Sequence, residues 1–167
     1  MSKKISIYTD GSCHGNPGPG GWCAIVLEDQ KSKLVKIAVL KGHETDTTNN
    51  RMEMIAAIEG LRYIHDQKLL TSDVTLYSDS SLVINTLMKG WKRKANKDLW
   101  EELDEMNEEL SVSFEWVKGH AKNVWNNECD KYANLEAGKA EKLLKKGDIA
   151  PVRNTTSRKS TQPNLFE

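Results

Sequence analysis

The apolar residues of this chain change from a strand-like to a helix-like period near residue 47, and this change most restricts the possible folds. Residues 5–10, 22–27 and 34–40 are short apolar or alternating runs, which predict three strands. The Gly/Pro-rich stretch 15–21 is predicted to be a turn-rich loop. Short connections between the runs favour an antiparallel meander.

After residue 47, Met54, Ile58 and Leu61 recur at helical spacing and predict a helix from about 50 to 66, with capping side chains at 47–50. The next elements are predicted to be a strand at 74–77 and a helix at 80–88. A further helix is marked by the helical spacing of Leu99, Leu103, Met106 and Leu110, and a strand follows at 112–116. The last helix ends near Gly147, and its apolar face carries Cys129, Ala133, Ala137, Ala140 and Leu144.

This order predicts an α/β fold: a five-stranded mixed sheet, with three antiparallel strands and then two parallel strands, and helices on both faces. The chain has 167 residues, of which 38% are hydrophobic, enough for one globular domain over residues 1–147. Residues 148–167 are rich in Pro, Asn, Ser, Thr and basic residues and are predicted to be a disordered tail.

Composition also suggests where the protein works. No signal peptide or membrane span is expected from the start of the chain. The three cysteines, Cys13, Cys23 and Cys129, show no CxxC spacing, which favours a reducing, cytoplasmic location. A monomer is expected, since the chain has no coiled-coil pattern.

The net charge of zero hides an uneven distribution. Residues 139–167 contain 7 Lys or Arg and 3 Asp or Glu, a net of +4, so the 17 basic and 21 acidic residues before them give −4. An acidic body beside basic patches suits a metal enzyme acting on a polyanion.

Asp10, Glu53, Asp79 and Asp130 lie far apart in sequence, yet each falls near a predicted strand end or helix start. The carboxyl edge of the sheet would bring Asp10 and Asp79 together. Two like charges about 4 Å apart cost roughly 4 kcal/mol at an effective dielectric of about 20, so a cluster implies divalent cations.

Each carboxylate also has a structural interpretation. Glu53 could close a capping box with Asn50, Asp79 could cap the helix at Ser80, and Asp130 could be a solvated helix residue. Zinc bound by Cys13, His14, His120 and Cys129 is disfavoured, because their spacing matches no zinc motif.

Several motifs resemble those of type 1 ribonuclease H. They are Tyr-Thr-Asp-Gly-Ser at 8–12, Gly-Asn-Pro-Gly at 15–18, Thr-Asn-Asn-Arg-Met-Glu at 48–53, Ser-Asp-Ser at 78–80, Trp-Val-Lys-Gly-His at 116–120, and Asn126 with Cys129-Asp130. The resemblance covers about residues 3 to 140 in unbroken order.

The resemblance implies an endonuclease that hydrolyses the RNA strand of RNA/DNA hybrids and leaves 3′-hydroxyl and 5′-phosphate ends. Asp10, Glu53, Asp79 and Asp130 would bind two Mg²⁺ ions, with Mn²⁺ as a possible substitute. His120 would assist as a proton shuttle or in product departure.

The resemblance also implies the substrate contacts. Asn16, Asn49 and Asn50 would read 2′-hydroxyl groups of the RNA. Thr48 and Asn96 would hold a phosphate of the DNA strand. The basic, aromatic stretch Trp91, Lys92, Arg93 and Lys94 suits phosphate contacts and stacking, and a solvated loop is the structural alternative.

Three departures from the family pattern stand out. Asp46 occupies a position where the family often has an arginine of the phosphate pocket. Only 18 residues separate Asp79 from Asp98, so the basic protrusion of the family is expected to be shortened here. Hybrid binding is therefore expected to be weaker or more salt-sensitive. Asn127 stands where some relatives have an acidic residue that influences metal occupancy.

The tail carries Gln162-Pro163-Asn164-Leu165-Phe166, which resembles the Q-x-x-L-F peptide that docks into the bacterial sliding clamp. Gln162, Leu165 and Phe166 would make that contact, and chance occurrence of so short a motif is the alternative.

For the whole chain, a catalytically silent hybrid-binding or partner-recruiting module of the same fold is the alternative function. A related integrase or transposase is disfavoured by the asparagines and by the absence of further DNA-binding domains.

Overall fold

The computed structural model describes residues 3–69, 73–119 and 122–147. Its elements follow the predicted order. They are β1 (Lys4–Cys13), β2 (Gly18–Gln30), β3 (Lys33–Thr47), α1 (Asn49–Asp66), β4 (Asp73–Ser78), α2 (Ser81–Lys89), α3 (Lys97–Glu109), β5 (Val112–Trp116) and α4 (Val124–Lys145).

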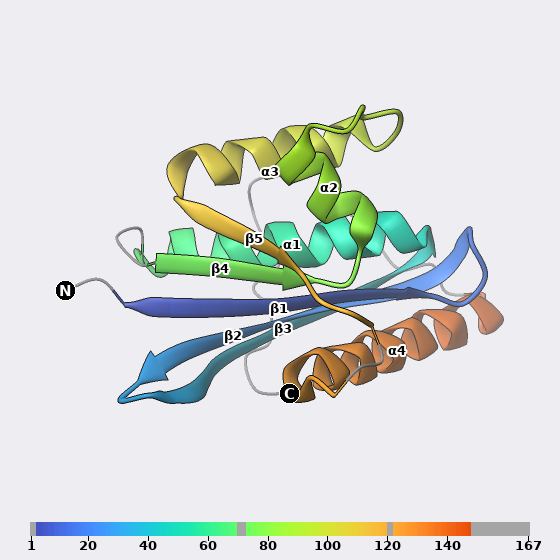
Figure 1. The fold of residues 1–167 in the computed structure, drawn as a ribbon. Coiled ribbons are helices and arrows are strands. Elements are labelled where there is room, and N and C mark those ends of the chain that lie inside the picture. Colours follow the sequence, from blue (N-terminus) through green and yellow to red (C-terminus); the bar gives the residue numbers. More distant parts are fainter. Residues whose placement is uncertain (1–2, 70–72, 120–121, 148–167) are drawn as a thin grey trace.

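The five strands form one sheet in the order β3-β2-β1-β4-β5. The pairs β1–β2 and β2–β3 are antiparallel, whereas β1–β4 and β4–β5 are parallel. The predicted mixed sheet is therefore confirmed. Since β4 lies beside β1 and runs in the same direction, the chain places the ends of these two central strands at one edge (Figure 1).

Helices cover both faces of the sheet, as predicted. Figure 1 shows α1, α2 and α3 on one side and α4 on the other. Strand alternation supplies both cores: Ile5 and Ile7 of β1 belong to the cluster that includes Ile58 of α1, whereas Tyr8 belongs to the cluster that includes Ala133 of α4. The period-2 pattern of β1 thus fastens α1 to one face and α4 to the other.

The Gly/Pro-rich stretch differs from its prediction, because Gly18–Gly21 belong to β2 rather than to a loop. Gly20 and Gly21 pair with Cys13 and Ser12 of β1. A Cβ on Gly21 would lie 2.3 Å from the main-chain oxygen of Ala133. The glycine is needed because α4 lies directly against the strand, so here it marks a close approach and not a chain reversal.

Helix caps decide two of the structural interpretations. Thr48 caps α1, with its hydroxyl accepting from the main-chain N–H of Arg51 at 3.2 Å. Ser80 caps α2, accepting from the N–H of Val83 at 3.2 Å. The predicted capping roles of Asn50 and Asp79 are therefore wrong, because the neighbouring hydroxyl residues have the capping geometry and leave Glu53 and Asp79 for another role.

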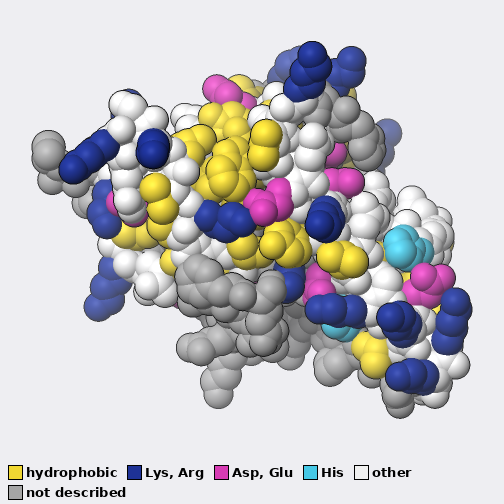
Figure 2. All heavy atoms as spheres, turned by 90° about the horizontal axis from the view of Figure 1, so that it is seen from below, with side chains coloured by type: hydrophobic (Ala, Val, Ile, Leu, Met, Phe, Trp, Pro, Cys, Tyr) yellow, Lys and Arg dark blue, Asp and Glu magenta, His cyan; other side chains and the backbone are white. Residues whose placement is uncertain are grey.

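The surface on the α4 side is mixed in character. Figure 2 shows hydrophobic side chains gathered near the middle of this face, with Lys and Arg side chains dispersed around them beside Asp and Glu. On the other side of the molecule, residues 90–96 connect α2 to α3 with no further helix between them. No helix within residues 3–69, 73–119 and 122–147 is long and apolar enough to cross a membrane.

Candidate active site

Asp10 and Asp79 are brought together by parallel strand pairing. Thr9 of β1 pairs with Ser78, the last residue of β4, so Asp10 is the next residue of β1 and Asp79 follows directly after β4. Asp10 is 2% exposed, and its Oδ1 accepts a hydrogen bond from the main-chain N–H of Gly11 at 2.9 Å. The edge predicted from topology is thus the place where the two carboxylates meet.

Glu53 reaches the same place because β1 has a glycine beside Asp10. A Cβ on Gly11 would lie 2.5 Å from the main-chain nitrogen of Glu53 and 2.8 Å from the Cβ of Met52. The missing side chain lets the first turns of α1 lie directly on β1. Glu53 is buried as a result, although its residue type favours solvent.

Asp130 is positioned by the residue before it. The buried Cys129 thiol donates to the main-chain oxygens of Tyr8 at 3.3 Å and Cys23 at 3.1 Å. Cys23 pairs with Asp10 across β1 and β2. The beginning of α4 is therefore fixed next to Asp10, and Asp130 lines the same cleft.

The site concentrates negative charge in a small space. One carboxylate oxygen each from Asp10, Glu53 and Asp79 lie within 4.8 Å of one another. Burial, with the neighbouring Asp79 charge next in importance, raises the pKa of Asp10 to about 8. Burial and the charge of Asp10 raise the pKa of Glu53 well above its usual range, and burial also raises the pKa of Asp79.

Two of these oxygens lack the partners that burial normally requires. Within the described residues, Asp10 Oδ2 and Glu53 Oε2 are buried without a hydrogen-bond partner. Both residues line a cleft of about 380 Å³ that Asp79 and Asp130 also line. Unpartnered carboxylate oxygens at this spacing fit a hard divalent cation, which prefers oxygen ligands and would neutralise the charge.

Amide side chains surround this cleft. Asn49 and Asn50 line it and are exposed at the start of α1. Asn16, in the loop between β1 and β2, accepts a hydrogen bond from the main-chain N–H of Asn49 through Oδ1 at 3.0 Å. The three asparagines predicted to read 2′-hydroxyls therefore lie around the carboxylates.

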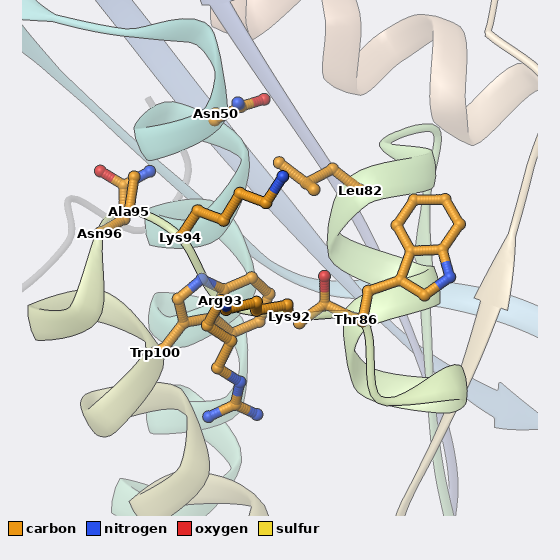
Figure 3. Close-up of a pocket in the computed structure, with 10 residues that line it drawn as sticks. Asn50, Leu82, Thr86, Lys92, Arg93, Lys94, Ala95, Asn96 and Trp100 are labelled. Carbon is orange, nitrogen blue, oxygen red and sulfur yellow. The ribbon is translucent and has the colours of Figure 1, made fainter.

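A second cavity adjoins the first. It has a volume of about 500 Å³, and Asn50 and Leu82 line both cavities. Figure 3 shows it between α1, α2 and α3. Its lining includes the predicted contact residues Trp91, Lys92, Arg93, Lys94 and Asn96.

The predicted phosphate pocket has an unpredicted member. Arg51 Nη1 donates to Asn96 Oδ1 at 3.2 Å, and the same guanidinium forms a fork with Asp98 at 2.9 and 3.1 Å. Arg51 thus connects the start of α1 to the start of α3, beside Thr48. Its place in the Thr-Asn-Asn-Arg-Met-Glu motif was visible in the sequence, but its partners are more than forty positions away.

Other residues that sequence reasoning missed include Ser81, Leu82, Thr86 and Trp100, which line the two cavities. Their helical periodicity predicts packing and not a site, so no local signal identifies them.

Several predicted residues lie outside the described part of the chain: His120, and Gln162, Leu165 and Phe166 of the tail.

Comparison with known proteins agrees with this geometry. The family model for RNase H matches residues 2–138. Ribonuclease H of Acetivibrio thermocellus is 41% identical over 154 residues, covering 84% of this chain and 99% of that relative. Ribonuclease H of Thermoanaerobacter sp. (strain X514) is 44% identical over 143 residues, covering 77% of this chain and 86% of that relative.

Solved structures share the fold. The N-terminal RNase H domain of a Mycobacterium tuberculosis protein superposes with a TM-score of 0.74 at 29% identity, covering 86% of this chain and 99% of that one. LC11-RNase H1, solved in complex with an RNA/DNA hybrid, has a TM-score of 0.71 at 26% identity and covers 83% of this chain and 99% of that one. The chain belongs to the ribonuclease H family and is a type 1 member of it.

Proposed function

We propose that this protein is an endonuclease that hydrolyses the RNA strand of RNA/DNA hybrids with the help of two Mg²⁺ ions, for which Mn²⁺ could substitute. The observation that carries the proposal is the meeting of Asp10, Glu53 and Asp79, with unpartnered buried oxygens, in a cleft that Asp130 also lines. Relatives named ribonuclease H and a neighbour solved with a hybrid support it.

The carboxylates of Asp10, Glu53, Asp79 and Asp130 would hold the metal ions. Bound divalent ions would polarise the scissile phosphate, promote ionisation of the attacking water and stabilise the leaving 3′ oxygen in an in-line displacement. With water as the nucleophile and the 3′ oxygen as the leaving group, the bond between phosphorus and the 3′ oxygen would break. The phosphate would stay on the 5′ end of one product, and the released oxygen would take up a proton to become a 3′-hydroxyl. No side chain of the cleft acts as a nucleophile in this scheme. The raised pKa values of Asp10 and Glu53 describe the metal-free protein, in which these groups retain protons that metal binding would displace.

The surrounding residues would select and place the hybrid. Asn16, Asn49 and Asn50 present amide groups beside the cleft, and amides both donate to and accept from a 2′-hydroxyl. An RNA strand lying over the carboxylates would place its paired DNA strand at the adjoining cavity. There Asn96 would hold a phosphate together with Thr48, the α1 cap whose neighbour Arg51 donates to Asn96, and Trp91, Lys92 and Lys94 would supply stacking and positive charge.

His120 keeps its predicted role as a helper in proton transfer or product departure. His120→Ala should reduce turnover and leave measurable cleavage, whereas Asp10→Asn should abolish cleavage. A His120→Ala variant with wild-type turnover at every pH between 6 and 9 would contradict this role.

The test of the function is cleavage of an end-labelled hybrid with Mg²⁺, with Mn²⁺ and with EDTA, beside duplex DNA, duplex RNA and single-stranded RNA. Asp10→Asn removes a cleft ligand, and Asp29→Asn is the matched control at an exposed site on β2. We expect metal-dependent cutting of the hybrid's RNA strand only, lost in Asp10→Asn and retained in Asp29→Asn. Hybrid binding without cleavage in either metal would favour the silent module.

A further inference from the structure

The connection between α2 and α3 carries most of the positive charge beside the second cavity, yet little holds it in place. Residues 90–96 contain no helix or strand. Among the described residues, no main-chain hydrogen bond joins residues 91–95 to the rest of the chain. Their one ion pair within the described part of the chain is formed by Arg93.

Arg93 is fastened to α3 by two kinds of contact. Its guanidinium forms a fork with the Asp104 carboxylate, in which Nη2 donates to Oδ1 at 2.9 Å and Nη1 donates to Oδ2. The guanidinium carbon also lies 4.8 Å from the ring centroid of Trp100, which is 4% exposed. Planar forks and stacking are geometries that arginine provides and lysine does not.

The neighbouring lysines are placed differently. Lys92 and Lys94 are exposed and line the second cavity, and neither forms an ion pair with a described residue. Figure 3 shows the Lys94 side chain reaching toward Leu82, which borders the carboxylate cleft, while the Arg93 guanidinium is turned away from Leu82 and Asn50.

We propose that Arg93 and Asp104 form a positioning pair that holds residues 91–95 against α3, so that Lys92, Lys94 and Trp91 face the DNA strand before it binds. This inference rests on the proposed function. It assigns Arg93 a different role from the phosphate contact expected from sequence, because its guanidinium donates to Asp104 and its guanidinium carbon lies over the Trp100 ring. In this chain the Arg93–Asp104 pair would keep a short connection ordered. A longer, structured protrusion would be kept ordered by its own packing.

The physical benefit is preorganisation. A free connection of this length must lose backbone and lysine side-chain freedom when the hybrid binds, and that loss weakens affinity. A connection already fastened to α3 has lost much of this freedom in the unbound protein. The pair should therefore act on the dissociation constant and on KM, and leave kcat at saturating hybrid unchanged.

Asp104→Asn distinguishes the positioning role from a simple effect of charge, because the two predict opposite changes in hybrid affinity. Removing a negative charge near a polyanion, and freeing an arginine, should strengthen binding if charge alone matters. If Asp104 holds the connection, Asp104→Asn should weaken hybrid binding by about fivefold, which is close to 1 kcal/mol.

The experiment is fluorescence-anisotropy titration of a labelled hybrid with the full chain in Ca²⁺, which permits binding to be measured apart from cleavage. The variants are Arg93→Gln, Asp104→Asn, their combination, and the exchange Arg93→Asp with Asp104→Arg. Glu101→Gln is the control for the charge change, since Glu101 is an exposed acid on the same helix as the half-buried Asp104. Melting temperatures show that each variant folds.

We expect Arg93→Gln and Asp104→Asn to weaken binding equally, their combination to add nothing further, and the exchange to recover affinity to within about twofold. Glu101→Gln should bind as well as the wild type or better. Arg93→Gln should keep the wild-type slope of log Kd against log salt, whereas loss of a phosphate contact would lower that slope by about 0.9. Amide exchange at 91–95 should be faster in Asp104→Asn.

Asp104→Asn with wild-type or tighter binding, together with a lower salt slope in Arg93→Gln, would overturn the positioning role and restore Arg93 as a phosphate contact. A wild-type chain that bound no hybrid would instead overturn the proposed function and this inference together. The two failures are thus distinguishable in one titration series.

Discussion

The indole Nε1–H of Trp116 donates a hydrogen bond to the main-chain carbonyl oxygen of Asp79 at 3.1 Å. Trp116 ends β5 and is 53% exposed, so burial of its ring does not account for its position. Just beyond it, a Cβ on Gly119 would lie 2.9 Å from Asp79 Oδ2. The end of β5 therefore holds the main chain of Asp79, and the absence of a side chain at Gly119 leaves room for the Asp79 carboxylate.

Trp116→Phe keeps an aromatic ring and removes the donor. Loss of one hydrogen bond of roughly 0.5–1.5 kcal/mol should weaken divalent-metal binding by about threefold to tenfold, because Asp79 becomes less well positioned. Calorimetric titration of Mn²⁺ into the hybrid-free protein measures this directly. Trp91→Phe removes another exposed indole and should alter hybrid affinity without altering Mn²⁺ affinity. Equal Mn²⁺ affinity in wild type and Trp116→Phe would refute the role of this bond.

The raised pKa of Asp10 makes the metal-free protein less stable as pH rises from about 4 to about 8. The ordinary pKa is 3.8 and the folded value is about 8, so between these values the folded state binds more protons than the unfolded state. The free energy of unfolding should therefore fall as pH rises through this window. Asp10→Asn should stabilise the metal-free protein by about 2 kcal/mol at pH 8 and flatten the pH dependence, as measured by urea unfolding in EDTA. A wild-type stability that rises from pH 5 to pH 8 would contradict the shift.

Gly21→Ala and Gly138→Ala form a matched pair of substitutions that should change the free energy of unfolding in opposite directions. A Cβ on Gly21 would meet main-chain atoms of α4 at 2.3 and 2.4 Å, whereas nothing lies within 4 Å of a Cβ on Gly138. Gly21→Ala should lower the free energy of unfolding by about 1–3 kcal/mol through overpacking. Gly138→Ala should raise it by about 1 kcal/mol through helix propensity. Chemical denaturation compares them, and a neutral Gly21→Ala would show that α4 can move away from β2.

Asp46→Arg tests whether the departure at this position weakens hybrid binding. Asp46 is exposed and lies two residues before Thr48, so an arginine there could reach the proposed phosphate pocket. We expect affinity to increase by about tenfold and the salt slope to steepen by about 0.9, both measured by anisotropy titration in Ca²⁺. Asp29→Arg makes the same charge change at the far end of β2. An equal gain in Asp29→Arg would mean that net charge, and not the pocket, is responsible.

The tail can be tested separately from catalysis. Deleting residues 161–167 should leave hybrid cleavage unchanged and abolish capture by an immobilised sliding clamp, because it removes Gln162, Leu165 and Phe166. Exchanging only Leu165 and Phe166 for alanine should have the same effect. Retention on the clamp by both variants would show that the peptide is a chance resemblance.

Most of the element order follows from local pattern. The alternation of Ile5, Ile7 and Tyr8 predicts a strand with two different faces, and the structure places them in two clusters. The helix-like spacing of Met54, Ile58 and Leu61 likewise matches α1. Glycine-rich Gly18–Gly21 was misjudged because local propensity contains no information about Ala133 and Ala137, the α4 residues that require glycine there.

The sequence by itself determined the strand and helix periods, because these depend on residues close together in the chain. It also placed each of the four acidic candidates near a predicted strand end or helix start. Tertiary structure decided that Asp10, Glu53 and Asp79 converge, since this depends on strand register and on the close approach that Gly11 permits. It also decided that the Arg93 guanidinium bonds to Asp104, although Arg93 is one of the residues that line the second cavity. The partner of an arginine depends on which carboxylate lies within hydrogen-bonding distance of its guanidinium. The packing of α3 beside the 90–96 connection sets the distance between Arg93 and Asp104.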